Sequence, residues 1–251
     1  MYPARRRVVR WQPYVLVAVV TFVTLLAASG YERQHLAASA RVLAGRTVLI
    51  DPGHGKPDPG ASGPGGAVET DIVLAIGLQL RDLLESRGVT VVMTRTTDQD
   101  LADPGERSLS KRKRQDLDRR VQLANEVVPE AVLSIHANAF PSSQWYGAQV
   151  FYQAENPESQ RLAVLLQQQL ARTTGNTTRR ASPRIDHCML SRVTTTAVTV
   201  EVGFLSNPRE AAMLLNPAYQ QRVAWAIYAG LIRYFAEGAL PTGATGIRLL
   251  R

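Results

Sequence analysis

The sequence predicts an α/β fold in which helices cover both faces of a central sheet. Short apolar runs, which suit buried strands, alternate along the chain with longer segments whose apolar residues recur at helical spacing. The chain has 251 residues, of which 45% are hydrophobic and 20% charged, so it can bury a substantial core. Sheets of this class bind their ligands at the carboxyl ends of the strands.

Local signals assign the elements in order. A buried strand is expected over 47–50, where Asp51-Pro52-Gly53 ends an apolar run. A long loop rich in Gly and Pro follows, and Thr70 is expected to cap a helix that Gly88 terminates. The later elements are, in order, a strand over 89–94, a polar stretch over 95–116, a helix from about 117 to 128, strands over 131–136 and 147–152, a helix over 158–173, a strand over 197–202 and a helix over 217–235.

The N-terminal region carries a candidate membrane segment. No charge occurs over 11–31, and this length is close to the roughly 20 residues that span a bilayer. Four arginines precede the segment and Glu32 follows it, so the positive-inside rule places the N-terminus in the cytoplasm and the rest of the chain outside. Residues 1–31 are therefore expected to form a cytoplasmic basic tip and a transmembrane signal anchor. Small residues at Ala27-Ala28-Ser29 leave open a cleaved signal and a secreted protein.

Three further regions follow the candidate anchor: a linker over 32–45, a folded domain over 46–237 and a C-terminal tail over 238–251. The net charge is +8, but six arginines and one acid in residues 1–44 leave only +3 for the rest. A net charge of +3 produces only a weak positive electrostatic potential around the domain, and this argues against nucleic acid as a partner. The basic run from Lys111 to Arg120 is expected to form a solvated face or loop, with a contact to an anionic polymer as the alternative.

Four ionisable residues are expected to meet at the carboxyl edge of the sheet. His54 follows the first strand, His136 ends the strand over 131–136, and Glu201 lies in the last strand. Glu69 precedes the first helix, where the chain leaving the glycine-rich loop can return beside the first strand. Two histidines and one carboxylate are a ligand set of catalytic zinc, which leaves a fourth position for water. Glu201 would then remain as a base.

Each of these residues also has a simpler explanation. His54 can be an ordinary turn residue, and Glu69 can be a surface acid that the helix dipole stabilises. His136 and Glu201 lie in apolar strands, where an unpaired imidazole or carboxylate is costly. A functional role is therefore favoured for Glu201 and is an even choice for His136.

Six sequence motifs are spread over 46–237 in an order that matches one enzyme family. They are VLIDPGHGKPDPGA, GAVETDIVLAIGLQLRDLLESRG, VVMTRTTDQDL, LDRRVQLAN, AVLSIHANA and VTVEVGFLSNPREAAML. Together they resemble the zinc-dependent N-acetylmuramoyl-L-alanine amidases, and the resemblance would make 46–237 the amidase catalytic domain. Within that family the chain looks most like the membrane-anchored, sporulation- and germination-type, CwlD-like amidases, because it has a single N-terminal segment and no wall-binding repeats.

The resemblance implies the site. The family's zinc ligands fall on His54, Glu69 and His136, its catalytic glutamate falls on Glu201, and one Zn²⁺ per chain is implied. The implied substrate is the amide between the lactyl group of N-acetylmuramic acid and L-alanine in peptidoglycan. The implied fold has three layers, with a mostly parallel, twisted sheet of about six strands between helices.

The resemblance also implies a biological role. A sporulation-type amidase would act in spore-cortex maturation, as a step toward muramic-δ-lactam. General cell-wall hydrolysis in cell separation is the alternative. A requirement for an activating lipoprotein partner stays open, as does a non-catalytic glycan-binding module that keeps the fold without turnover.

Four more residues lie close to the motif histidines or to each other. Asp51 and Asn138 flank the two histidines, and metal-bound imidazoles donate their second N–H to an acceptor, so both are candidates for orienting ligands or positioning substrate. His187 is a rival ligand, a polar contact to substrate or an ordinary loop residue. Cys188 is the single cysteine, so an intramolecular disulfide and a multi-thiolate metal site are excluded.

Overall fold

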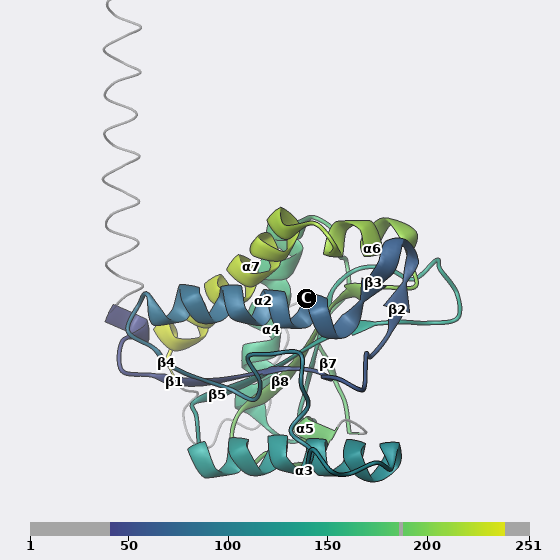
Figure 1. The fold of residues 1–251 in the computed structure, drawn as a ribbon. Coiled ribbons are helices and arrows are strands. Elements are labelled where there is room, and N and C mark those ends of the chain that lie inside the picture. The colour runs from purple at the N-terminus through teal and green to yellow at the C-terminus, as the bar shows by residue number, and fades with distance from the viewer. Residues whose placement is uncertain (1–40, 186–187, 239–251) are drawn as a thin grey trace, which may run out of the picture. The chain divides into compact units, whose positions relative to one another are not determined.

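Six strands form the central sheet of the computed structural model, which describes residues 41–185 and 188–238 (Figure 1). The strands are β1 (Thr47–Pro52), β4 (Thr90–Met93), β5 (Ala131–Asn138), β6 (Gln149–Tyr152), β7 (Ser182–Pro183) and β8 (Ala197–Phe204). They lie in the order β4-β1-β5-β8-β6-β7. The first four of these run parallel, and β6 is antiparallel to β8, so the predicted mostly parallel sheet is confirmed.

Several predicted regions lie outside the described residues. These are the candidate membrane segment over 1–31, the linker up to residue 40, His187 and the tail from residue 239. None of the helices among the described residues is long and apolar enough to span a membrane. Packing of the domain begins before residue 46, since Leu43 is fully buried in the larger core.

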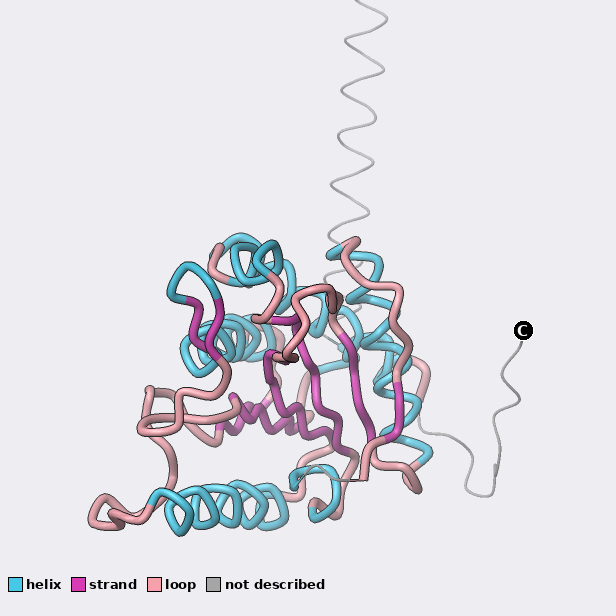
Figure 2. Tube along the Cα trace, turned by 90° about the vertical axis from the view of Figure 1, so that its right-hand side faces the viewer, coloured by secondary structure: helices cyan, strands magenta, loops and turns pink. Residues whose placement is uncertain are grey.

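Helices cover the two faces of the sheet unequally (Figure 2). The helices are α2 (Glu69–Glu85), α3 (Leu109–Val127), α4 (Pro157–Thr174), α5 (Cys188–Arg192), α6 (Pro208–Leu214) and α7 (Pro217–Ala236). Helices α2, α4 and α7 pack on one face with most of the core, and α3 and α5 pack on the other with a smaller apolar cluster. The polar site described below lies on the face with the smaller cluster.

Strand parity decides which side chains face which layer. In β8, Val198, Val200 and Val202 join the larger core, whereas Ala197 belongs to the smaller cluster beside α3. Glu201 has the parity of Ala197, because successive side chains of a strand alternate between faces. The sparsely covered face of the sheet therefore carries the carboxylate, and the well-covered face carries the valines.

The first helix does not begin as predicted. α2 starts at Glu69, and Val68 occupies the N-cap position without a side-chain hydrogen bond. Thr70 lies inside the helix, and its hydroxyl is 3.1 Å from Oδ1 of Asp98. The predicted cap at Thr70 was wrong because a tertiary contact engages the hydroxyl. Five other short strands and α-helices were not predicted, since they are too short to show a period: β2 (Ser62–Gly63), β3 (Ala67–Val68), β7, α5 and α6.

The basic segment also differs from its prediction. α3 starts at Leu109 rather than near 117, and its polar first turns are tied down by Arg112, whose Nη2 lies 2.6 Å from Oδ1 of Asp100. Arg114 is exposed, but Arg120 is only 1% exposed and is among the largest fully buried side chains of the domain. A solvated face is therefore correct for part of the segment and wrong for Arg120.

Candidate metal centre

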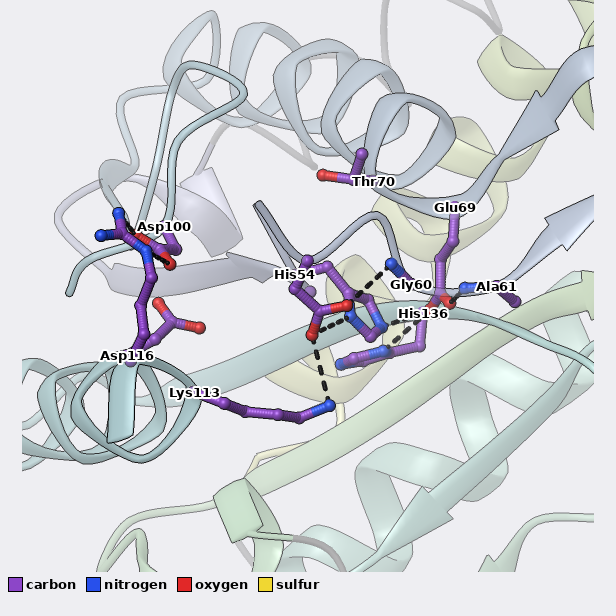
Figure 3. A network of polar contacts seen from close by, with 12 residues as sticks. His54, Gly60, Ala61, Glu69, Thr70, Asp100, Lys113, Asp116 and His136 are labelled. Atoms are coloured by element: carbon purple, nitrogen blue, oxygen red, sulfur yellow. Dashed lines mark hydrogen bonds and ion pairs between the residues drawn. The ribbon is translucent and has the colours of Figure 1, made fainter. Parts of the chain in front are cut away.

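Three side chains converge beyond the carboxyl ends of β1 and β5 (Figure 3). Oε1 of Glu69 lies 3.1 Å from Nε2 of His54 and 3.0 Å from Nδ1 of His136. One ligand atom from each of the three residues lies within 4.8 Å of the other two. Within 41–185 and 188–238, no other group of three His, Cys, Asp or Glu side chains gathers ligand atoms in this way. The structure therefore brings together the three residues that the sequence singled out.

Two buried arginines hold the turn that carries His54. The residue has a φ of 63°, in the left-handed region that side chains other than glycine seldom adopt. Nη2 of Arg95 donates to the carbonyl oxygen of Gly53 at 2.7 Å. Arg120 donates to the carbonyl oxygen of Pro52 at 2.8 Å and also to that of His54. These bonds fix the backbone on both sides of the histidine.

Asp51 supports this turn through Arg120. Its Oδ1 lies 2.7 Å from Nη1 of Arg120, and its carboxylate also accepts from Ser134 at 2.6 Å and from Thr94 at 2.8 Å. Burial would raise the pKa of Asp51, but the charge of Arg120 and these hydrogen bonds outweigh burial and lower it to about 2. Asp51 was predicted to orient a ligating histidine or to position substrate. In the structure it contacts Arg120, which the sequence analysis did not single out, and Arg120 in turn holds the turn that carries His54.

A short hairpin returns the chain to the site and places Glu69. β2 and β3 pair, and Glu69 opens α2 directly after β3. Its Oε2 accepts from the backbone N of Ala61 at 2.8 Å, and its Oε1 accepts from that of Ala137 at 3.0 Å. Burial raises the pKa of Glu69, but hydrogen bonds with His136 and His54 lower it overall, well below its usual range. These surroundings favour the ionised form of Glu69, which is the form that binds a metal ion.

Two glycines leave room for the ligand side chains. A Cβ at Gly53 would lie 2.5 Å from Nε2 and 2.7 Å from Nδ1 of His136. A Cβ at Gly60 would lie 2.6 Å from Oε2 of Glu69 and 2.8 Å from Cδ2 of His54, and the backbone there has a φ of +68°. Larger residues would push the imidazoles and the carboxylate apart.

Asp58 was missed by the sequence analysis. Its Oδ2 lies 3.1 Å from Nδ1 of His54, so His54 holds Asp58 with one nitrogen and directs the other toward Glu69. Burial lowers the pKa of His54, but its bonds with Glu69 and Asp58 raise it overall. Lys113 adds a 3.2 Å ion pair to the same oxygen of Asp58. A carboxylate four residues after a histidine, in a loop rich in Gly and Pro, was the signal available in the sequence.

Removing the acceptor of His54 is expected to weaken metal binding. We expect Asp58→Ala to lower zinc affinity about 10- to 100-fold, since a carboxylate behind a ligating histidine fixes its tautomer and orientation. Competition with a zinc-binding dye measures the change. Lys113→Met is the matched control, because it removes only an exposed ion pair to Asp58. Equal zinc affinities of the Asp58 and Lys113 variants would argue against this role.

Glu201 lies beside the three convergent residues, in register with His136 on the neighbouring strand. Its carboxylate is buried, and Oε2 accepts no hydrogen bond from the described residues. Burial raises the pKa of Glu201, and the charge of Glu69 adds to this, while His136 opposes it. A buried carboxylate with an unused oxygen is costly unless it serves a ligand or a reaction.

The predicted roles of Asn138 and His187 in orienting ligands or binding substrate stay predictions. Asn138 ends β5, and its carbonyl oxygen accepts from the backbone N of Leu205 at 2.7 Å. It lies two residues after His136, across a register shift of the strand pair. His187 lies outside the described residues, so its role stays a prediction.

The residues present suit a zinc ion. Two imidazole nitrogens and one carboxylate oxygen are the donor types of catalytic zinc sites, and these sites keep one position open. Glu201 is in register with His136, keeps one oxygen without a hydrogen bond from the described residues and is not needed as a ligand. The arrangement can therefore hold a metal ion and keep a separate carboxylate for proton transfer.

Comparison with known proteins assigns the family. The sequence model of the N-acetylmuramoyl-L-alanine amidases matches residues 48–233. The chain belongs to this family. The amidase is 44% identical over 199 residues to the germination-specific N-acetylmuramoyl-L-alanine amidase of Bacillus subtilis (strain 168). The aligned residues cover 79% of this chain and 84% of the relative. It is 32% identical over 201 residues to the probable cell wall amidase LytH of Staphylococcus epidermidis (strain ATCC 12228 / FDA PCI 1200), covering 79% of this chain and 62% of LytH.

Solved structures agree with the assignment. The CwlD amidase from Clostridioides difficile, solved in complex with the GerS lipoprotein, has a TM-score of 0.74 and 36% identity, covering 76% of the amidase and 99% of that chain. The catalytic domain of CwlV from Bacillus (Paenibacillus) polymyxa has a TM-score of 0.66 and 31% identity, covering 76% and 98%. The resemblance noted in the sequence is confirmed, and the amidase is a hydrolase of peptidoglycan.

Proposed function

We propose that the amidase is zinc-dependent, with His54, Glu69 and His136 as ligands and Glu201 as the general base. The observation that carries this proposal is the register of β5 and β8, which sets the buried Glu201 carboxylate beside His136 with one oxygen unused. The bond that breaks joins the lactyl carbonyl carbon of N-acetylmuramic acid to the nitrogen of L-alanine.

Proton transfer is assigned to Glu201. Zinc, when bound, supplies Lewis acidity toward the carbonyl oxygen and makes water more acidic. Glu201 removes a proton from the attacking water, whose oxygen bonds to the carbonyl carbon, and returns the proton to the departing amine. Burial raises the pKa of this carboxyl, which makes the carboxylate a stronger base toward the attacking water. Asp58, Asp51 and Arg120 keep His54 oriented.

For the biological role we propose spore-cortex maturation, in which removal of stem peptides precedes formation of muramic-δ-lactam. The 44% identical relative is named germination-specific, and this supports the proposal. General cell-wall hydrolysis in cell separation is the second candidate, and the similarity to LytH favours it. Spores of a deletion strain, analysed for muramic-δ-lactam, separate the two roles.

Location and partner are proposals as well. The N-terminal charge pattern supports a single-pass anchor, or a cleaved signal, with the catalytic domain outside the cytoplasm. The CwlD amidase was solved with the GerS lipoprotein, which supports a lipoprotein as an activating partner. Peptidoglycan strands are then the substrate on the same side of the membrane.

Metal removal tests the zinc proposal. We expect the full chain to hold one zinc and, with the proposed lipoprotein partner present, to release L-alanine-terminated peptides from purified peptidoglycan. Chelation should abolish release, and added Zn²⁺ should restore it, because the three ligand side chains alone do not activate water. Elemental analysis and mass spectrometry of the released peptides measure both quantities. Undiminished release by a metal-free chain would contradict the proposal.

A further inference from the structure

A row of side chains crosses three strands at the site. His136 on β5 is in register with Glu201 on β8, and Glu201 is in register with Gln149 on β6. Side chains directly opposite on neighbouring strands share a face of the sheet and lie about 5 Å apart. Gln149 therefore lies on the far side of Glu201 from the candidate metal ligands.

Arg179 extends this row beyond Gln149. Its Nη1 donates to Oε1 of Gln149 at 3.1 Å, and its Nε donates to the carbonyl oxygen of Tyr146 at 2.7 Å. The guanidinium carbon lies 4.6 Å from the ring centroid of Phe204 and 5.6 Å from that of Trp145. Two hydrogen bonds and two rings thus fix the guanidinium, which is half-buried.

The charge of Arg179 has no acidic partner among the described residues. Other arginines fixed by the fold differ in this respect: Arg112 pairs with Asp100, and Arg120 pairs with Asp51. Arg179 bonds only to neutral oxygens, and Nη2 donates to no described residue. Nη1 keeps one hydrogen beyond the bond to Gln149, so the Nη1–Nη2 edge of the guanidinium can still bind a carboxylate through two parallel bonds.

Glu210 does not form an ion pair with the guanidinium of Arg179. Its carboxylate accepts from the backbone N of Phe204 at 2.8 Å and of Gly147 at 3.0 Å, and from the side chain of Asn176 at 2.5 Å. Burial raises the pKa of Glu210, and Arg179 influences it only through its charge. The oxygens of Glu210 are thus committed to other donors.

We propose that Arg179 binds a carboxylate of the stem peptide and positions the peptide for hydrolysis. This rests on the proposed function, in which Glu201 returns its proton to the amine of L-alanine. The amine must then lie at Glu201, so the peptide leaves the site across β8 and β6, toward Gln149 and Arg179. The sugar lies at the opposite end of the row, on the side of His54. A carboxylate that follows the alanine meets the guanidinium beyond Gln149, which itself lies one strand spacing, about 4.8 Å, from Glu201.

Two soluble probes test the assignment. N-Acetylmuramoyl-L-alanyl-D-glutamate and N-acetylmuramoyl-L-alanyl-D-isoglutamine differ only in whether one carboxyl is free or amidated. Binding is measured calorimetrically to the full, zinc-loaded chain carrying Glu201→Gln, so that neither probe is consumed. We expect the acid probe to bind about tenfold more tightly than the amide probe, the range for a charge-assisted pair. Adding Arg179→Gln should remove this ratio and leave the affinity for the amide probe unchanged.

Two further substitutions, at Arg180 and at Arg179, separate a role of Arg179 in carboxylate binding from a purely structural role. Arg180→Gln removes the same charge from the next residue, which is exposed, and should preserve the tenfold ratio. Arg179→Lys keeps the charge without the planar fork and should retain part of the ratio. Equal binding of both probes to the chain with Arg179, or no measurable binding of the acid probe, would overturn the proposal. So would an Arg179→Gln variant that weakens both probes alike, which would indicate a structural role.

Failure of this proposal and failure of the proposed function are distinguishable. Hydrolysis of peptidoglycan by the chain with Glu201 tests the function and does not involve the two probes. If the chain with Glu201 hydrolyses peptidoglycan but the Glu201→Gln chain does not discriminate between the probes, only the role of Arg179 is wrong.

Discussion

Glu201→Gln is expected to lower kcat about 10²- to 10⁴-fold while zinc stays bound, the range for a lost general base. Glutamine has nearly the same shape as glutamate but does not take up a proton from water at neutral pH. The carboxylate is not needed to complete the three-ligand set of His54, Glu69 and His136. Metal content should therefore stay at one zinc per chain. Single-turnover release of peptide from purified peptidoglycan measures the rate.

The contrasting variant is His136→Ala, which removes a ligand and is expected to lose both the zinc and the hydrolysis. Elemental analysis of the two variants therefore separates the base from the ligand. Near-normal hydrolysis by Glu201→Gln would show that another group moves the proton. Zinc loss in Glu201→Gln would instead make Glu201 part of the metal site.

Arg120→Met is expected to cost about 3–5 kcal/mol of unfolding free energy, the range for breaking a buried ion pair by removing one partner. The guanidinium lies between Asp51 and Asp116, and all three side chains are buried. Methionine fills much of the volume but leaves the carboxylate of Asp51 without its cation. The carbonyl oxygen of His54 loses a donor as well, so zinc affinity should fall with stability.

Urea unfolding of the full chain measures this loss. Arg114→Met is the matched control on the same helix, because Arg114 is exposed, and such surface changes fall within about 0.5 kcal/mol. The double variant Arg120→Met with Asp51→Asn should cost less than the sum of the single changes, since the two groups contact each other. A loss below about 1 kcal/mol for Arg120→Met would contradict a structural role for the pair.

The same pair predicts a pH dependence of stability. The pKa of Asp51 is lowered from 3.8 to about 2 in the fold, so its stabilisation is fully present above about pH 4 and is lost as the pH falls toward 2. The loss amounts to roughly 2–3 kcal/mol. Unfolding free energies of wild type and Asp51→Asn, measured from pH 5 to pH 2, should therefore converge as the pH falls. Parallel curves would show that Asp51 does not titrate in this range.

The sequence allowed the candidate ligands to be predicted because strand ends are easy to recognise. His54 and His136 each follow or end an apolar run, and Glu201 interrupts a run of valines. These signals depend on neighbours in the chain. The order of the strands was not accessible in this way, because it depends on contacts between distant segments, such as β5 with β8.

The supporting residues were harder to predict for the same physical reason. Arg120 stands in a run of charged residues, where one buried arginine looks like its exposed neighbours. Only the spacing of four from Asp116 indicated a pair, and such pairs are common on helix surfaces. Asp58 and Arg179 gain their roles from contacts with His54 and Gln149 that no local pattern announces. Thr70 shows the reverse error, since a residue suited to a helix cap was engaged by a distant aspartate.

The three candidate ligands come from the loop after β1, from the start of α2 and from β5, so they are neighbours only in the folded domain. An unfolded chain offers zinc no comparable site, and mass action then makes zinc a stabiliser of the native state. At a free zinc concentration 100 times the dissociation constant, this linkage adds about 2.7 kcal/mol. Under the proposed zinc dependence, scarcity of zinc would thus lower the lifetime of the enzyme together with its activity, so that abundance and turnover would decline together.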